Sequence, residues 1–283
     1  MLLKTLSLHP KSIRLVYFRY IIILFILCAQ VKSHAQQYEF GITGFGTGYM
    51  GDINPDNPFY YQNIGGGLSV KYNLNPTWGI KAGFNYIALH GNDLDSKFGA
   101  QQDRALQFNN NLKELSVTAE FNFFRFIAGR AINRYTPYLL AGVSVALHDP
   151  YINLDGTTIK LRELQLEYDA EHNPDKYSKI ALSVPFGLGF KHNIRGPWSI
   201  GAEIIYRTTF NDNIDNVSKN YATSRPRTSA VSPETWDFLA DPSGQLEEHR
   251  GKARGNGKNY DGFMTAGFTL TYTLISAKCY WWQ

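Results

Sequence analysis

Apolar residues alternate with small or polar residues along eight stretches of the chain, and no stretch after residue 35 shows a helical period. Alternation with period two is typical of a β-strand whose two faces lie in different surroundings. Each stretch is about as long as the roughly 9–11 residues that cross a bilayer as a tilted strand. The eight stretches run over residues 38–50, 67–74, 78–86, 114–123, 139–147, 180–191, 198–207 and 264–274.

The segments between these stretches are short and long in turn. Short segments lie at 75–77, 125–137 and 192–197, and long ones lie at 51–64, 91–110, 148–178 and 210–260. Short periplasmic turns, long extracellular loops and an even number of strands are typical of bacterial outer-membrane barrels. The pattern therefore predicts an all-β fold: an eight-stranded antiparallel transmembrane outer-membrane β-barrel of a Gram-negative cell, with both termini periplasmic.

The polar face of the strands is expected to line the lumen, because it consists mostly of Gly, Ser and Thr, which fit a narrow bore. Trp78 and Trp198 each begin a strand directly after a proline turn, which favours an aromatic girdle at one membrane interface over two core tryptophans.

Charges of both signs share the polar face. Since buried charges persist only when they are paired, we expect an ion-pair network that fills the lumen, with a proton relay as the alternative. The residues of the expected network are Glu39, Glu114, Glu120, Glu203, Lys71, Lys81, Lys191 and Arg207.

Residues 1–35 have the features of a signal peptide. A basic segment precedes the apolar run 21–29, and Ser33-His34-Ala35 offers small residues for cleavage after Ala35. We therefore expect three regions, the signal peptide 1–35, the barrel domain 36–279 and a C-terminal tail 280–283. The signal holds five of the 28 basic residues, so the remaining 23 basic and 24 acidic residues give no basic excess for nucleic acid. Cys279 is the only cysteine after cleavage.

The sequence offers no arrangement of residues for catalysis, and we expect no cofactor or metal site. The first long loop has Asn57 where a calcium-binding EF-hand needs Gly, so that pattern fails. The histidines after the signal lie at strand ends or in loops, without a serine–histidine–acid constellation. Asp212 and Asp215 can at most hold incidental calcium at the outer lip.

Two connections differ in composition. The long last loop is rich in Pro, Ser, Gly and charge, so we expect it to be solvated and mobile. The second short turn carries Phe124, Phe126, Arg130 and Arg134, and aromatic residues with arginine are enriched in protein-docking surfaces. We expect this turn and the tail after Leu274 to dock a periplasmic partner. Alternatively, the phenylalanines belong to the lower aromatic girdle and the arginines to the headgroup zone.

Seven short motifs follow one another between residues 38 and 279. They are Gly51-Asp52, Tyr72-Asn73-Leu74-Asn75-Pro76, EFNFF at 120–124, YLLAGV at 138–143, VPFGLGFKH at 184–192, YRTTFNDNIDNVSKNY at 206–221 and FTLTYTL at 268–274. Their order and spacing resemble the PorG-type outer-membrane barrel of the type IX protein secretion system of Bacteroidetes-like bacteria. The last four residues, 280–283, depart from that pattern.

The resemblance implies a non-enzymatic component of the secretion machine that contacts its periplasmic ring and lipoprotein subunits. It also implies that Asp52, Asp212 and Asp215 form a structural motif at the outer lip. Two other functions stay open, namely a small structural or adhesin-like barrel that binds a partner through its outer loops, and a lipid A-modifying barrel enzyme. Outer-membrane lipid is an expected partner, whereas nucleic acid and a small-molecule substrate are not.

Overall fold

The structure is a computed structural model, which describes residues 38–275 except residues 55–56, 58, 131–132, 170, 172, 228 and 256–259. The predicted signal peptide, Cys279 and the tail 280–283 lie outside the described residues.

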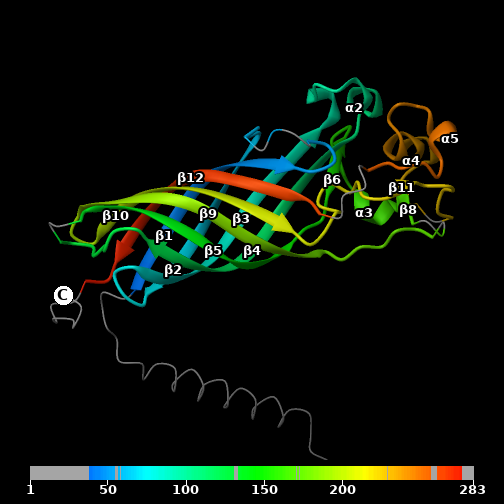
Figure 1. Cartoon of the computed structure of the whole chain (residues 1–283). Coiled ribbons are helices and arrows are strands. Elements are labelled where there is room, and N and C mark those ends of the chain that lie inside the picture. Colours follow the sequence, from blue (N-terminus) through cyan, green and yellow to red (C-terminus); the bar gives the residue numbers. More distant parts are fainter. Residues whose placement is uncertain are drawn as a thin grey trace, which may run out of the picture. The chain divides into compact units, whose positions relative to one another are not determined.

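Eight long antiparallel strands form a closed barrel, which confirms the predicted fold class (Figure 1). Each strand pairs with the next long strand along the chain, and the first pairs with the last over twelve residue pairs, from Glu39↔Thr273 to Met50↔Gly262. The barrel strands are β1 (Tyr38–Met50), β2 (Asn63–Asn73), β3 (Trp78–Asn92), β4 (Gln107–Asn122), β5 (Tyr135–Leu147), β9 (Ile180–Arg195), β10 (Trp198–Thr209) and β12 (Gly262–Thr273).

Several strands are longer than their alternating stretches. The β3–β4 ladder continues to Asn92↔Gln107, and β9 continues to Arg195, so that only Gly196 and Pro197 connect it to β10. Ladder hydrogen bonds join main-chain groups, so a strand can continue where side-chain alternation has stopped. The end of the barrel with the three short connections is called the turn end, and the opposite end is called the loop end.

The apolar face of the strands is outside and the polar face is inside. Leu115, Val117 and Val143 are 58%, 52% and 65% exposed. Glu114 and Thr118, which are next to Leu115 and Val117 in the sequence, are buried. A continuous exposed apolar band around a closed barrel, with polar side chains within it, is the arrangement of a transmembrane β-barrel.

Aromatic side chains surround the barrel at the turn end. The rings of Trp78 and Trp198 are both exposed and lie 4.8 Å from Phe121 and 5.0 Å from Tyr272, respectively, between ring centroids. Because the two indoles lie on the outer surface at one end, they belong to an aromatic girdle and are not core residues.

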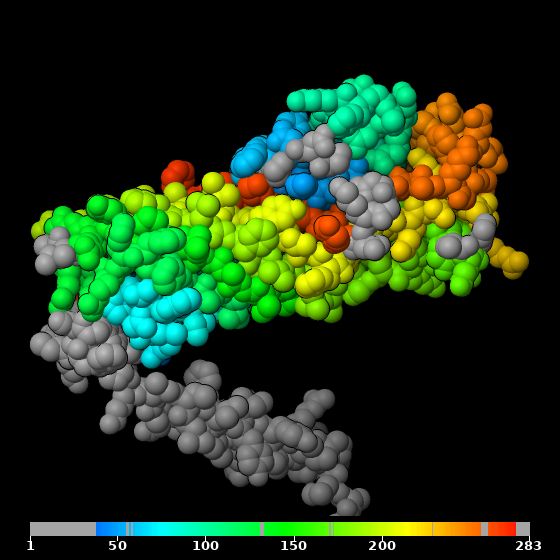
Figure 2. Space-filling model, in the orientation of Figure 1, coloured from blue at the N-terminus to red at the C-terminus, as the bar shows by residue number. Residues whose placement is uncertain are grey.

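The described residues of the four long loops, 51–62, 93–106, 148–179 and 210–261, lie together at the loop end and form a body that we call the cap (Figure 2). Its short elements are η1 (Asp93–Asp95), α2 (Gly99–Arg104), β6 (Tyr151–Leu154), β7 (Thr157–Lys160), α3 (Leu161–Leu164), β8 (Glu167–Tyr168), β11 (Asn220–Tyr221), α4 (Pro233–Ala240) and α5 (Leu246–His249). Among the described residues, no helix is long and apolar enough to cross a membrane.

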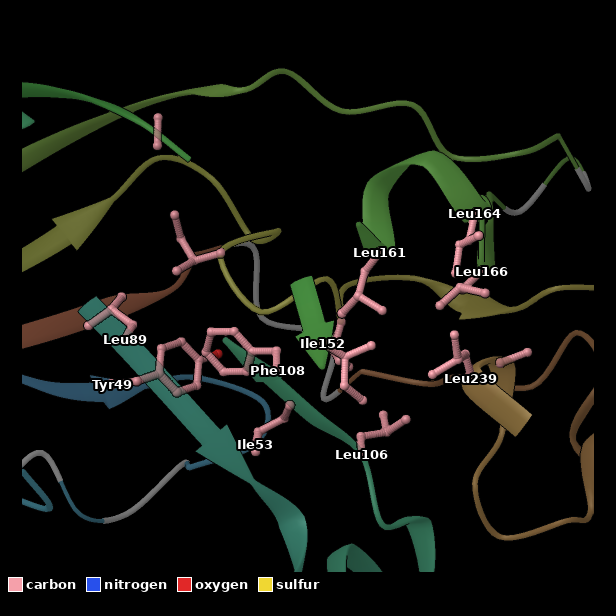
Figure 3. Packing of buried hydrophobic residues seen from close by; sticks show 14 of the residues in the cluster. Tyr49, Ile53, Leu89, Leu106, Phe108, Ile152, Leu161, Leu164, Leu166 and Leu239 are labelled. Atoms are coloured by element: carbon pink, nitrogen blue, oxygen red, sulfur yellow. The ribbon is translucent and has the colours of Figure 1, made fainter. Parts of the chain in front are cut away.

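The cap has its own hydrophobic core, which is continuous with apolar side chains from the ends of the strands. Leu161 and Leu164 of α3 pack with Leu239 of α4, beside Tyr49 of β1 and Phe108 of β4 (Figure 3). All five side chains are buried. Residues from loops far apart in the sequence therefore share one core.

The described residues of the last loop include two helices and a buried tryptophan, where the sequence predicted a solvated and mobile segment. Ser232 accepts a hydrogen bond from the backbone N–H of Thr235 and caps α4, and Pro233 starts the helix. Trp236 is fully buried, and its Nε1 donates to the carbonyl oxygen of Leu164 at 2.9 Å. The polar composition of the loop did not indicate that Trp236 is buried and holds the loop in place.

The orientation of the two strand faces gives a first prediction. Val117→Arg places a charge on the lipid-facing surface. It is therefore expected to destabilise the folded barrel in lipid vesicles, lowering the free energy of unfolding by roughly 2–4 kcal/mol. Thr269→Ser is the control, because Thr269 faces the lumen and serine keeps the hydroxyl that bonds Thr43. Equal and small effects of both substitutions on folding would contradict the assignment of the faces.

The anchoring of the cap gives a second prediction. Trp236→Ala removes a buried indole and its hydrogen bond, so it is expected to destabilise the cap by roughly 3–5 kcal/mol and to open the last loop to trypsin. Phe238→Ala is the matched control on the same helix, because its ring is 45% exposed. The cap assignment fails if the two variants are digested at the same rate.

Candidate functional site

The lumen near the turn end holds a cluster of four charged side chains. Lys71 Nζ lies 2.6 Å from Glu39 Oε2 and 2.9 Å from Glu120 Oε1, and Lys191 Nζ also contacts Glu120 Oε1. The side chains come from β1, β2, β4 and β9, so the cluster crosses the bore. All four are buried.

The lumen nearer the loop end holds two further ion pairs. Glu203 Oε1 lies 2.7 Å from Lys81 Nζ and accepts a hydrogen bond of 2.7 Å from the hydroxyl of Tyr138. Arg207 Nε lies 2.7 Å from Glu114 Oε1, and Asn85 Nδ2 donates to the other oxygen of Glu114 at 2.8 Å. The structure thus brings together all eight charges of the expected network.

These pairs leave little space in the bore. Two cavities lined by lumen-facing residues measure about 40 and 30 Å³, which is room for roughly one water molecule each. A buried ion pair is held in place because separating it would leave an uncompensated charge. Paired charges from the described strands therefore occupy the bore.

The turn end is closed by the second short turn, which folds into the barrel mouth. The backbone N–H of Phe126 donates to the carbonyl oxygen of Pro76 at 3.1 Å, and its ring lies 4.8 Å from Lys191 Nζ. Phe126 is only 6% exposed. Its ring therefore covers the lumen charges, and the docking role that the sequence suggested for Phe126 stays a prediction.

The other residues of that candidate surface are exposed. Phe124 lies 6.1 Å from Tyr135, which stacks on Phe190, so Phe124 joins the aromatic girdle as the alternative interpretation had it. Arg130 and Arg134 are exposed at the turn end.

The loop end is closed by apolar side chains. Phe45, Ile87, Leu112 and Phe263 are buried at the ends of their strands and merge with the core of the cap. The guanidinium carbon of Arg207 lies 5.3 Å from the centre of the Phe263 ring, so this layer lies directly over the charged one. The alternation of strand residues did not reveal this layer, because apolar side chains there face inward.

Acidic side chains meet beneath the cap, at the predicted lip motif. The hydroxyl of Tyr49 lies 2.6 Å from Asp215 Oδ2 and 2.8 Å from Asp261 Oδ1. A phenol has one hydrogen to donate, so one of these two carboxyl groups carries a proton when both contacts are hydrogen bonds. Burial, together with neighbouring carboxylates, raises the pKa of Asp215 and of Asp261 well above the usual range.

Asp52 and Asp212 complete this acidic group. Burial, and then the charges of Asp52 and Glu167, raise the pKa of Asp212 to about 7. Carboxylate oxygens of Asp52, Asp212 and Asp261 lie within 4.8 Å of one another and can together hold a cation, for which oxygen ligands suit calcium. The sequence allowed at most incidental calcium at Asp212 and Asp215 and did not indicate Asp261, since nothing near Asp261 in the sequence marks it as a partner of Asp52 and Asp212.

Two histidines, His148 and His249, lie in the loops of the cap. His148 is buried and stacks on Tyr177 at 6.0 Å between centroids, and burial lowers its pKa to about 4. His249 Nδ1 lies 2.7 Å from Asp241 Oδ2. Within the described part of the chain, the hydrogen bonds join no serine hydroxyl to a histidine side chain.

Together these observations define a transmembrane β-barrel of eight strands whose lumen is filled and closed at both ends. The chain belongs to the family described as a domain of unknown function, DUF6089, whose model matches residues 18–283. No curated protein sequence matches the chain.

Solved structures of bacterial outer-membrane proteins share the topology at low identity. OprG of Pseudomonas aeruginosa is 10% identical, with 84% of this chain and 97% of that chain covered and a TM-score of 0.38. The attachment invasion locus protein Ail of Yersinia pestis is 13% identical, with 84% and 99% covered and a TM-score of 0.36. The N-terminal barrel domain of Pseudomonas aeruginosa OprF is 11% identical, with 83% and 98% covered and a TM-score of 0.35. Likenesses of this level carry no argument about function.

The filled lumen gives a third prediction. The wild-type protein is expected to show no stable ion conductance in planar bilayers. Arg207→Ala leaves Glu114 buried with a charge, so it is expected to cost roughly 3–5 kcal/mol of stability without opening a pore. The double variant Glu114→Gln/Arg207→Met removes both charges and is expected to recover much of that loss. Steady single-channel currents from the wild type would contradict the filled lumen.

Proposed function

We propose that this protein is a non-enzymatic outer-membrane β-barrel that acts through its surfaces, as a component of a type IX protein secretion system. One observation carries the proposal. The lumen is filled by ion pairs and closed by Phe126 at one end and by the cap at the other, so the barrel itself offers no passage. Its apolar exterior suits lipid, and the exposed surfaces outside the lipid are left to contact partners.

The topology supports an orientation in the outer membrane. Three short turns lie at one end and four long loops at the other, which in outer-membrane barrels correspond to the periplasm and the exterior. Both ends of the barrel domain, Tyr38 and Thr273, lie at the turn end. With this orientation they face the periplasm.

The turn end supports contact with the periplasmic ring and lipoprotein subunits. Arg130, Arg134 and Arg195 are exposed there beside the aromatic girdle. Arginine is enriched in protein interfaces, where its fork of donors pairs with carboxylates. The proposed docking surface therefore consists of Arg130, Arg134 and Arg195 and does not include Phe126. The type of secretion system comes from the order of sequence motifs, from Gly51-Asp52 to FTLTYTL.

A second function is favoured by a different observation, the folded cap. It presents exposed aromatic side chains from two loops, including Phe59 at 64% and Phe98 at 49% exposure. A rigid outer surface with exposed aromatic residues suits an adhesin-like barrel that binds a partner outside the cell.

Two double variants separate these functions. Arg130→Ala/Arg134→Ala alters the turn end, and Phe59→Ala/Phe98→Ala alters the cap. The secretion role predicts that only the first variant loses export of type IX cargo and pull-down of periplasmic subunits, because it removes the docking charges. Lys219→Ala/Lys252→Ala, which removes two exposed cations of the cap, is the control for net charge.

Each variant must first give the same heat-modifiable folded band as the wild type. Unchanged export in the arginine variant, together with loss of surface adhesion in the aromatic one, would overturn the secretion role in favour of the adhesin-like function.

A further inference from the structure

Three cations gather on a single carboxylate where the third long loop leaves the barrel. Asp149 Oδ2 lies 2.8 Å from Lys179 Nζ and 3.1 Å from Lys160 Nζ, and its Oδ1 lies 3.5 Å from Arg162 Nε. Lys160 ends β7 and Arg162 lies in α3, whereas Lys179 directly precedes β9. One acid thus holds cations from three segments at one place.

A fourth cation lies on the neighbouring strand. Lys113 of β4 is opposite Leu147 of β5 in the ladder, and Leu147 is opposite Ile180 of β9. Opposed residues of antiparallel strands point to the same side of a sheet. Leu147 and Ile180 are 54% and 52% exposed on the lipid-facing surface, so Lys113 emerges on that surface too.

The row formed by Lys113, Leu147 and Ile180 marks the outer edge of the apolar band. On the other side of Lys113 lies the exposed Tyr86, and aromatic residues and lysines are typical of the interface between hydrocarbon and headgroups. Asp149 follows Leu147 by two residues, so the cation cluster stands directly above the apolar side chains. The cluster therefore lies at the depth of lipid headgroups.

The charge of this place is strongly positive. Asp149 pairs with Lys160, Arg162 and Lys179, and Lys113 adds a fourth cation on the neighbouring strand. These four cations and one carboxylate have a net charge of +3. Glu163 and Asp155 are close in sequence, yet the ion pairs of the described residues join neither of them to these cations. Among the same residues, Lys113 forms no ion pair with a carboxylate.

We propose that this cluster binds the phosphate of an anionic lipid of the outer leaflet, with its acyl chains against Leu147 and Ile180. A phosphate oxyanion supplies the missing negative charge, and lysine is well suited to bind it as a point charge. Basic clusters next to a lipid-facing surface bind anionic headgroups in this way. The inference rests on the membrane placement in the proposed function and is independent of the secretion role.

The ion pairs to Asp149 also fasten the β6–β7 hairpin and α3 to the barrel, which is a purely structural role. That role does not need Lys113, which makes no such contact. Lys113→Gln therefore separates lipid binding from fastening of the loop.

The test measures lipid binding to the mature chain, folded in non-ionic detergent, by native mass spectrometry. The probes are lipid A, which carries two phosphates, and zwitterionic phosphatidylcholine. Lys113→Gln is expected to weaken binding of lipid A by about fivefold, and the double variant Lys113→Gln/Lys179→Gln is expected to weaken it by about 25-fold. Binding of phosphatidylcholine is expected to change little.

Lys219→Gln/Lys252→Gln is the matched control, since it removes the same charge from exposed positions in the cap. An equal loss in this control would overturn the site in favour of general charge attraction. Complete displacement of lipid A by excess inorganic phosphate would overturn the lipid as its occupant in favour of free phosphate.

A separate assay tests the proposed function. It measures insertion of the protein into lipid vesicles, monitored by the heat-modifiable band of the folded barrel. Wild-type protein that inserts but binds lipid A no better than phosphatidylcholine overturns this inference alone. Failure to insert overturns the proposed function.

Discussion

The lack of water in the hydrocarbon layer is the constraint on which the rest of the structure depends. A backbone N–H or C=O without a partner is costly there, so strands can cross only as a closed sheet. The twelve residue pairs between β1 and β12 satisfy this requirement, because they join the first strand to the last and leave no edge in the lipid. Closure with eight strands then fixes a bore just wide enough to be filled by side chains.

The narrow bore determines what happens to the charges inside it. Glu114 and Arg207 are too deeply buried to be solvated, so each is held by the other and by neighbouring polar groups. Such pairs add little net stability compared with apolar residues, but breaking one is costly, so they fix the register of the strands that carry them.

The cap and the cationic cluster show how the loop end extends the barrel. Apolar side chains such as Phe108 and Ile87 face inward at the strand ends, where the loops supply Trp236 and the leucines of α3 to cover them. The loops are thereby held against the rim, and Asp149 pairs there with cations from three of their segments. The same packing brings Asp261 to Asp215 beneath the cap.

The sequence by itself determined the strands, the alternation of their faces and the charges that line the lumen, because period two is a local property that each strand shows alone. It did not determine where Phe126, Trp236 and Asp261 lie. Phe126 resembles an exposed turn residue until the barrel mouth is closed around it, and the loop around Trp236 has the composition of a solvated segment. Burial of these residues depends on contacts with strands and loops distant in the sequence. Those contacts exist only once the barrel has closed, so only the tertiary structure could decide them.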